Sequence, residues 1–156
     1  MTSTGAEEAL RLRKIELPPP PAPKGAYAPV VVHGGEAWVS GMLPLRDGQL
    51  LAKGLVGSDV TVERAKEAAR LAALNSLSAL RSVLGNLDRV ERILRVGVFV
   101  ASAPQFTAQP EVANGASELL VEVFGESGRH ARAAIGAARL PLDTPVEVEM
   151  VVAVRP

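Results

Sequence analysis

Three charged side chains stand in otherwise apolar, sheet-like sequence near the end of the chain. Arg132 is followed by small residues, and Glu147 and Glu149 alternate with valines. A guanidinium can hold a carboxylate through two parallel hydrogen bonds, and a partly desolvated glutamate can hold or deprotonate a water molecule. A cation and two carboxylates in sheet-like sequence need an explanation, and we place the function in this segment.

The segment that carries these charges, residues 130–154, reads as two strands joined by a turn that contains proline, which predicts a hairpin. In the second strand Glu147 and Glu149 share one face, while the alternating valines and Met150 share the other face, toward the helices. In the first strand Arg132 shares its face with small residues, namely Ala134, Gly136 and Ala138. Small neighbours leave room beside a guanidinium, which favours a cavity over a packed ion pair.

The register of this expected hairpin separates Arg132 from Glu147. If the turn lies near residue 142, the two residues are five or six rungs apart, roughly 16–20 Å at about 3.3 Å per residue. The face with the charges is also too apolar for water, and no third layer in the sequence covers it. We therefore expect other copies of the chain to cover it. One chain would then offer Arg132 and its neighbour Glu147.

The preceding sequence predicts the elements that position these residues. Strands are expected over 27–33 and 36–40 around Gly34-Gly35, and over 92–101. Helices are expected from Thr61 to about Leu84 and from Thr107 or Gln109 to Phe124. The order is β-β-α-β-α-β-β, which indicates a single α+β domain with both helices on one face of a mixed sheet. Residues 1–24 form an N-terminal extension with a marginal helix and a proline-rich segment, and the domain spans 25–156.

Composition excludes several classes of protein. The chain has 156 residues, formal net charge zero, 3% aromatic residues and no cysteine. Zero net charge and few aromatics argue against nucleic-acid binding, and the absence of cysteine excludes disulfides and thiolate metal sites. The two histidines, His33 and His130, are too far apart in sequence to suggest a zinc site; we expect a structural role for His33 and a solvated loop position for His130. With no apolar signal region or membrane span, the chain is expected to be cytoplasmic.

The order of several short motifs resembles the RidA/YjgF family of imine deaminases, also described as endoribonuclease L-PSP-like. The motifs are Gly25-Ala26-Tyr27, Val39-Ser40-Gly41-Met42-Leu43-Pro44, Asn114, Ala131-Arg132-Ala133 and Leu140-Pro141 followed by Val146-Glu147-Val148-Glu149. The resemblance covers nearly everything from Tyr27 to Val154, and the long N-terminus resembles a longer branch of the family. It implies a chorismate mutase-like fold and a homotrimer with three clefts at subunit interfaces.

The resemblance also implies roles for individual residues. Arg132 corresponds to an arginine that binds the substrate carboxylate, and Glu147 to a glutamate that positions the water attacking an imine carbon. The cleft would be lined by Tyr27, Ser40, Gly41 and Asn114, with backbone groups of Ala133 and Ala134 beside the arginine. The substrates would be short-lived 2-imino or 2-enamino acids, and the products 2-keto acids and ammonia. No metal or organic cofactor is required.

The chain departs from the family pattern beside the arginine, and other readings stay open. Ala133 and Ala134 stand where active members commonly have serine or threonine and then cysteine. Arg132 could instead form a structural ion pair at an interface, and Glu149 is expected to be structural. A binding or regulatory module that holds a 2-keto acid without turnover is the alternative function. A ribonuclease is a third class, which the zero net charge disfavours.

Overall fold

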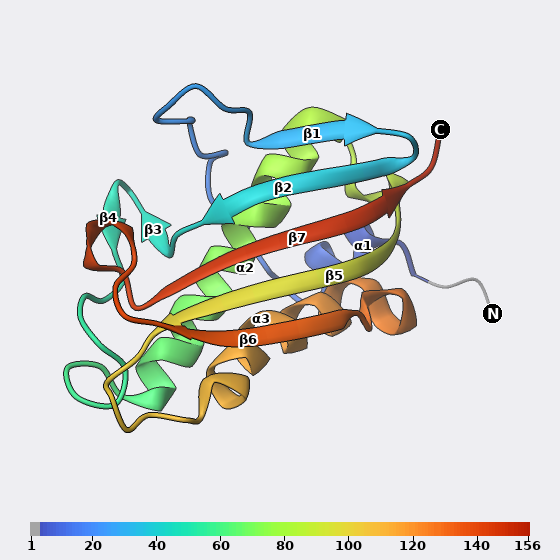
Figure 1. Ribbon diagram of the computed structural model, residues 1–156. Helices are drawn as coiled ribbons and strands as arrows, with labels where there is room; N and C mark the ends of the chain where they lie inside the picture. Colours follow the sequence, from blue (N-terminus) through green and yellow to red (C-terminus); the bar gives the residue numbers. More distant parts are fainter. Residues whose placement is uncertain (1–3) are drawn as a thin grey trace.

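A five-stranded mixed sheet forms one layer of the protein, and three α-helices lie together behind it (Figure 1). The computed structural model describes residues 4–156; residues 1–3 of the extension lie outside the described part. The strands are β1 (Val30–His33), β2 (Glu36–Met42), β3 (Leu45–Arg46), β4 (Gln49–Leu50), β5 (Val90–Ala101), β6 (Ala131–Ala137) and β7 (Val146–Val154). The α-helices are α1 (Ala6–Leu12), α2 (Val62–Leu84) and α3 (Gln109–Phe124), and the 3₁₀ helices are η1 (Leu87–Arg89), η2 (Gly125–Gly128) and η3 (Pro141–Asp143).

The strand order is β1-β2-β7-β5-β6, and β3 pairs with β4 in a separate small hairpin. Strands β5 and β6 are parallel, and the other neighbours in the sheet are antiparallel. The predicted α+β class, the mixed sheet and the two long helices on one face are therefore confirmed. The first predicted hairpin is also confirmed, because β1 and β2 pair across Gly34-Gly35.

The predicted hairpin between the last two strands is wrong. Strand β5 lies between β6 and β7, so these two strands do not touch as partners. Strand β6 instead continues from α3 and runs parallel to β5, the usual result when a helix connects two strands of one sheet. Strand β7 then crosses to the centre of the sheet, where its face of alternating valines and Met150 is buried under the helices.

The helix layer follows the predicted signals closely. The Thr61 hydroxyl accepts a hydrogen bond from the Arg64 N–H at 3.1 Å and caps α2, and Gly85 ends this helix with φ +82°. The expected apolar stripe of α2 is buried, and it consists of Ala65, Ala69, Ala72, Leu77, Leu80 and Leu84. The N-terminal extension belongs to the same layer, since Ala6 and Leu10 of α1 are buried in the core.

Helices α2 and α3 are in close contact at Gly115, where a Cβ would overlap the backbone carbonyl oxygen of Lys66. We therefore expect Gly115→Ala to lower the free energy of unfolding by about 1–3 kcal/mol, although alanine is the better helix former. Urea unfolding followed by circular dichroism measures this change. The added variant Lys66→Ala should not restore the loss, because it removes a side chain and leaves the carbonyl in place.

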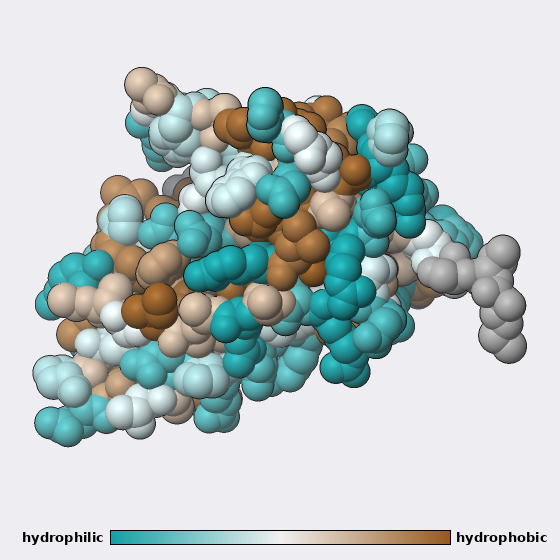
Figure 2. Space-filling model, turned by 45° about the vertical axis from the view of Figure 1, so that its right-hand side comes forward, coloured by the Kyte–Doolittle hydropathy of each residue, from teal (hydrophilic) through white to brown (hydrophobic). Residues whose placement is uncertain are grey.

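The other face of the sheet is open. Among residues 4–156 every α-helix lies behind the sheet, and the front of β2, β7, β5 and β6 faces outward (Figure 1). Hydrophobic residues gather on the surface seen in Figure 2, between hydrophilic ones. Trp38 is 55% exposed on this face, and Val31 and Ile135 are 52% and 48% exposed. In the same described range no helix is long and apolar enough to cross a membrane.

Candidate functional site

Arg132 lies on the helix side of the sheet, on a strand that pairs with β5 and not with β7 as the expected hairpin required. It pairs with Val96 of β5, and Val96 pairs with Met150 of β7; both partners are buried beneath the helices. Because β6 is the edge strand, the arginine side chain emerges at the sheet margin beside α3. Its Nη1 donates to Asn114 Oδ1 at 2.8 Å and to Ser117 Oγ at 3.1 Å.

The guanidinium is held by neutral groups only. None of the ion pairs within residues 4–156 includes Arg132, and both of its hydrogen-bond acceptors are uncharged. Asn114 and Ser117 are three residues apart on α3, so one face of the helix presents both oxygens. The arrangement orients the guanidinium and leaves its charge available to an anion. Asn114, which the resemblance placed in the same cleft as Arg132, is thus its hydrogen-bond partner within one chain.

His130 joins this group and is not the solvated loop residue that we expected. Its Nε2 lies 2.9 Å from Ser117 Oγ, and its Nδ1 lies 2.7 Å from the backbone oxygen of Gly128. Partial burial lowers the pKa of His130; the Gly128 carbonyl opposes this shift, and the nearby Arg132 charge adds to it. Sequence reasoning missed both Ser117 and His130. The three-residue spacing from Asn114 to Ser117 was the available signal.

Glu147 lies on the opposite, open face of the sheet. Glu147 pairs with Phe99 of β5. Along β7 it lies three residues from Met150, and Met150 is level with Arg132 because both pair with Val96 of β5. Two strand spacings of about 4.8 Å and three residues of about 3.3 Å place the two Cα atoms roughly 14 Å apart. Arg132 and Glu147 are thus apart within one chain, but the predicted register is wrong and the separation is smaller than the roughly 16–20 Å expected from it.

The carboxylate of Glu147 is half-buried against β2. A Cβ at Gly41 would overlap its Oε1, so the glycine makes room for the carboxylate. Burial raises the pKa of Glu147, and the negative charge of Glu149 raises it further. A carboxylate with a raised pKa is a better general base near neutral pH than an ordinary one.

Ser40 and Gly41 form a bulge within β2, and the strand continues to Met42 instead of ending at Ser40 as predicted. The Ser40 hydroxyl donates to the Ala28 carbonyl at 2.7 Å, and its N–H donates to the Pro29 carbonyl at 2.9 Å. These bonds hold the segment that follows Tyr27 against β2. Tyr27 itself is 54% exposed.

We expect Gly41→Ala to push the Glu147 carboxylate into solvent while the fold is kept, because the obstacle is the end of a flexible side chain. The pKa of Glu147 should then fall toward its ordinary value. A carboxyl-carbon NMR titration measures it, with Ser40→Ala as a control that leaves Gly41 unchanged. An unaltered titration of Glu147 in the Gly41→Ala variant would contradict the packing described above.

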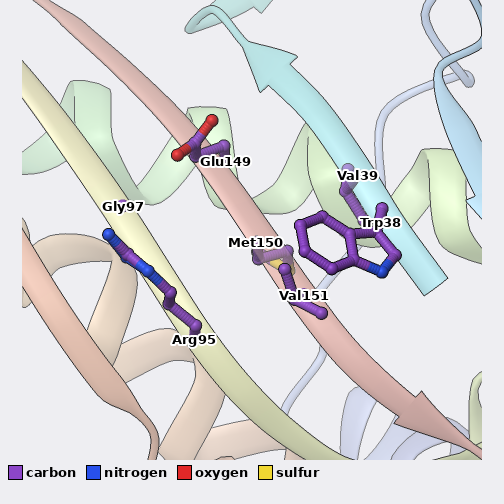
Figure 3. Close-up of a pocket in the computed structure, with 7 residues that line it drawn as sticks. All are labelled: Trp38, Val39, Arg95, Gly97, Glu149, Met150 and Val151. Atoms are coloured by element: carbon purple, nitrogen blue, oxygen red, sulfur yellow. The ribbon is translucent and has the colours of Figure 1, made fainter. Parts of the chain in front are cut away.

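The remaining predicted residues divide between the two faces. Ala134 is level with Val98 on the helix side and packs against the core, whereas Ala133 is level with Gly97 on the open face. Glu149 also lies over Gly97. It borders a shallow hollow of about 190 Å³, lined with Trp38, Arg95 and Val151 (Figure 3). Figure 3 shows the indole of Trp38 beside Val151, its partner in the sheet, with Arg95 on the far side of β7.

Comparisons with known proteins agree with this fold. Residues 7–153, which include most of α1, match the family described as "YjgF/chorismate mutase-like, putative endoribonuclease". Protein TCP17 of Trypanosoma cruzi is 46% identical over 139 residues, which are 88% of this chain and 87% of that protein.

Two solved structures resemble the chain over nearly its whole length. Protein Atu1372 of Agrobacterium tumefaciens, of unknown function, is 40% identical with a TM-score of 0.89, covering 96% of this chain and 92% of that one. A protein of Shewanella oneidensis, described as a putative endoribonuclease, is 33% identical with a TM-score of 0.92, covering 96% and 99%. The chain belongs to the YjgF/chorismate mutase-like (RidA) family.

Proposed function

We propose that this chain hydrolyses small 2-imino and 2-enamino acids to 2-keto acids and ammonia. One observation carries the proposal: Arg132 is oriented by two neutral oxygens at the sheet margin and has no carboxylate partner within residues 4–156. A bidentate bond from this guanidinium to a substrate carboxylate would fix the neighbouring imine carbon. Imines already hydrolyse in water, so positioning supplies much of the catalysis.

Glu147 is the proposed base. Its carboxylate takes a proton from a water molecule as the oxygen bonds to the imine carbon, and it returns that proton to the nitrogen, which gives a carbinolamine. The hydroxyl proton of the carbinolamine then passes to the nitrogen through the same carboxylate, and ammonia leaves as the carbon–nitrogen bond breaks and the carbonyl forms. The raised pKa of Glu147 suits this role, because the group must both accept and return a proton.

The proposed site is shared between copies of the chain. Arg132 and Glu147 lie on opposite faces of one sheet, so one chain cannot bring both to one small substrate. The open face carries exposed apolar side chains, namely Val31, Trp38 and Ile135. Packing of this face against further copies, as a trimer, would bury them and could bring the glutamate of one copy to the arginine of the next.

A second function is favoured by the same geometry. A single chain has a carboxylate-binding arginine without a water-positioning glutamate beside it, and Ala133 and Ala134 supply no hydroxyl. Such a site would bind a 2-keto acid without turnover and act as a regulatory module. The family description as an endoribonuclease is not adopted, because a chain of zero net charge offers little attraction to a polyanion.

The deciding experiment generates 2-iminobutanoate or 2-aminoacrylate in situ with a pyridoxal-phosphate dehydratase and follows keto acid and ammonia release. We expect the purified protein to accelerate release and Arg132→Ala to abolish the acceleration. Arg132→Lys should recover little of the acceleration, since lysine keeps the positive charge but lacks the two parallel N–H donors of a guanidinium. Arg11→Ala, which alters an exposed arginine on α1, is the matched control. Equal rates with wild-type protein, with Arg132→Ala and without protein would reject deamination of these substrates, and 2-ketobutyrate binding in that case would favour the module.

A further inference from the structure

We propose that Ser117 and His130 are positioning residues of the Arg132 site, which fix the guanidinium so that a ligand carboxylate meets its Nε–H and Nη2–H edge. The inference rests on the proposed function only in taking a carboxylate as the ligand of Arg132. It is carried by an unbroken series of hydrogen bonds that begins at Arg132 and ends at the backbone carbonyl of Gly128.

The first step concerns the hydrogens of Arg132. Nη1 has two N–H groups, and Asn114 Oδ1 at 2.8 Å and Ser117 Oγ at 3.1 Å accept one each. The remaining donors are Nε–H and the two N–H groups of Nη2, for which the described part of the chain provides no acceptor. Nε–H and one hydrogen of Nη2 are parallel, which is the side-on fork that fits both oxygens of a carboxylate.

The second step concerns the direction of the hydrogen bonds. The Gly128 carbonyl can only accept, so Nδ1 of His130, 2.7 Å away, carries the proton. In a neutral imidazole Nε2 is then a bare acceptor, and the Ser117 hydroxyl, 2.9 Å away, donates to it. The lone pairs of Ser117 Oγ are thereby free to accept from Arg132. The donor and acceptor of each hydrogen bond in this series therefore determine the donor and acceptor of the next.

The third step concerns the rigidity of the series. Gly128 lies where η2 leads into β6, and a Cβ there would overlap the backbone oxygen of Leu120 in α3. This close approach places the Gly128 carbonyl relative to α3, which also carries Ser117 and Asn114. His130 therefore bridges Ser117, which α3 carries, and the Gly128 carbonyl, which is held by packing against α3. Partial burial lowers the pKa of His130, which favours the neutral imidazole that the series requires.

The tautomer of His130 provides the first test, because it does not depend on any activity. We expect ¹⁵N NMR of the histidine side chains at neutral pH to show His130 with a proton on Nδ1 and none on Nε2. His33, on exposed β1, serves as the internal comparison. A proton on Nε2, or a fully protonated ring, would overturn the proposed direction of the hydrogen bonds.

Ligand binding provides the second test, with 2-ketobutyrate as the probe and calorimetry as the measurement. Ser117→Ala and His130→Ala should each weaken binding about tenfold, a loss typical of one well-made hydrogen bond. Ser117→Thr keeps a hydroxyl, and His130→Gln keeps an acceptor near the place of Nε2, so both should bind nearly as the wild type does. Thermal unfolding of each variant checks that the fold is kept.

The two proposals fail in different ways in this experiment. If Arg132→Ala binds 2-ketobutyrate as tightly as the wild type does, or the wild type does not bind it, Arg132 is not a carboxylate site and both proposals fall. If Arg132→Ala loses binding while Ser117→Ala and His130→Ala retain it, the positioning proposal alone is rejected. Loss in both alanine variants with recovery in Ser117→Thr and His130→Gln supports it.

Discussion

Glu147→Gln should give a protein that is more stable at neutral pH and hydrolyses imines about 100-fold to 10,000-fold more slowly than the wild type. The loss of rate follows from removing a general base, whose usual contribution has this size. The gain in stability follows from removing a half-buried carboxylate whose charge is disfavoured by burial and by Glu149. Opposite changes in stability and activity from one substitution would mark Glu147 as a functional residue instead of a structural one.

The stability gain should depend on pH in a definite direction. The pKa of Glu147 is higher in the folded chain than in the unfolded chain, so folding favours the protonated form. Wild-type stability due to this group is fully present below its unfolded pKa and is lost as the pH rises through its folded value. The melting temperature of Glu147→Gln should therefore match the wild type near about pH 3.5 and exceed it near about pH 7.5. Glu91→Gln, an exposed carboxyl on β5, is the control; an equal gain there, or a gain at low pH alone, would contradict the assignment.

Mixing two inactive variants should restore activity, and this is the second large effect that we expect. If each site takes Arg132 from one chain and Glu147 from its neighbour, a random mixture of Arg132→Ala and Glu147→Gln chains contains sites with both wild-type residues. About a quarter of the sites are then intact, because each residue is wild type in half of the chains. Activity near a quarter of the wild-type value, against almost none for either variant alone, is the expected result.

The mixed sample must be formed by unfolding and refolding the two variants together, so that their subunits exchange. The same treatment of each variant by itself is the control. Light scattering during the assay measures the oligomeric state of the refolded samples. If the refolded mixture is as inactive as its components while a wild-type sample treated in the same way recovers, the shared site is rejected.

Much of the helix layer could be predicted from the sequence because its signals are local. Thr61 and Gly85 mark the ends of α2 through their own hydrogen bonding and backbone conformation, and these signals need no knowledge of distant residues. Strand β7 was recognisable as a strand from its alternating valines. Its neighbours were not, because pairing depends on which distant strand is available and not on the strand's own residues.

The site was predictable in part for the same reason. The resemblance placed Arg132 and Asn114 in one cleft, and in the structure the two side chains are hydrogen-bonded to each other. The partner strand of Arg132 did not follow, because β6 and β7 were expected to form a hairpin and β5 lies between them. Eight residues, 138–145, connect β6 to β7, and this is enough chain to pass the end of β5. His130 was missed because its role depends on the Gly128 carbonyl, and that position is set by tertiary contact.

The location of Arg132 on an edge strand has a further consequence, for the solubility of the chain. Strand β6 has the sequence Ala-Arg-Ala-Ala-Ile-Gly-Ala, in which Arg132 is the single charged residue, and one side of its backbone has no partner strand in the sheet. Unpaired apolar edges invite association with other strands, and a charge in their midst discourages it. We therefore expect Arg132 to limit aggregation at this edge as well as to bind the substrate carboxylate. Arg132→Lys separates the two roles, since lysine keeps a positive charge on the edge strand but cannot form two parallel hydrogen bonds to a carboxylate.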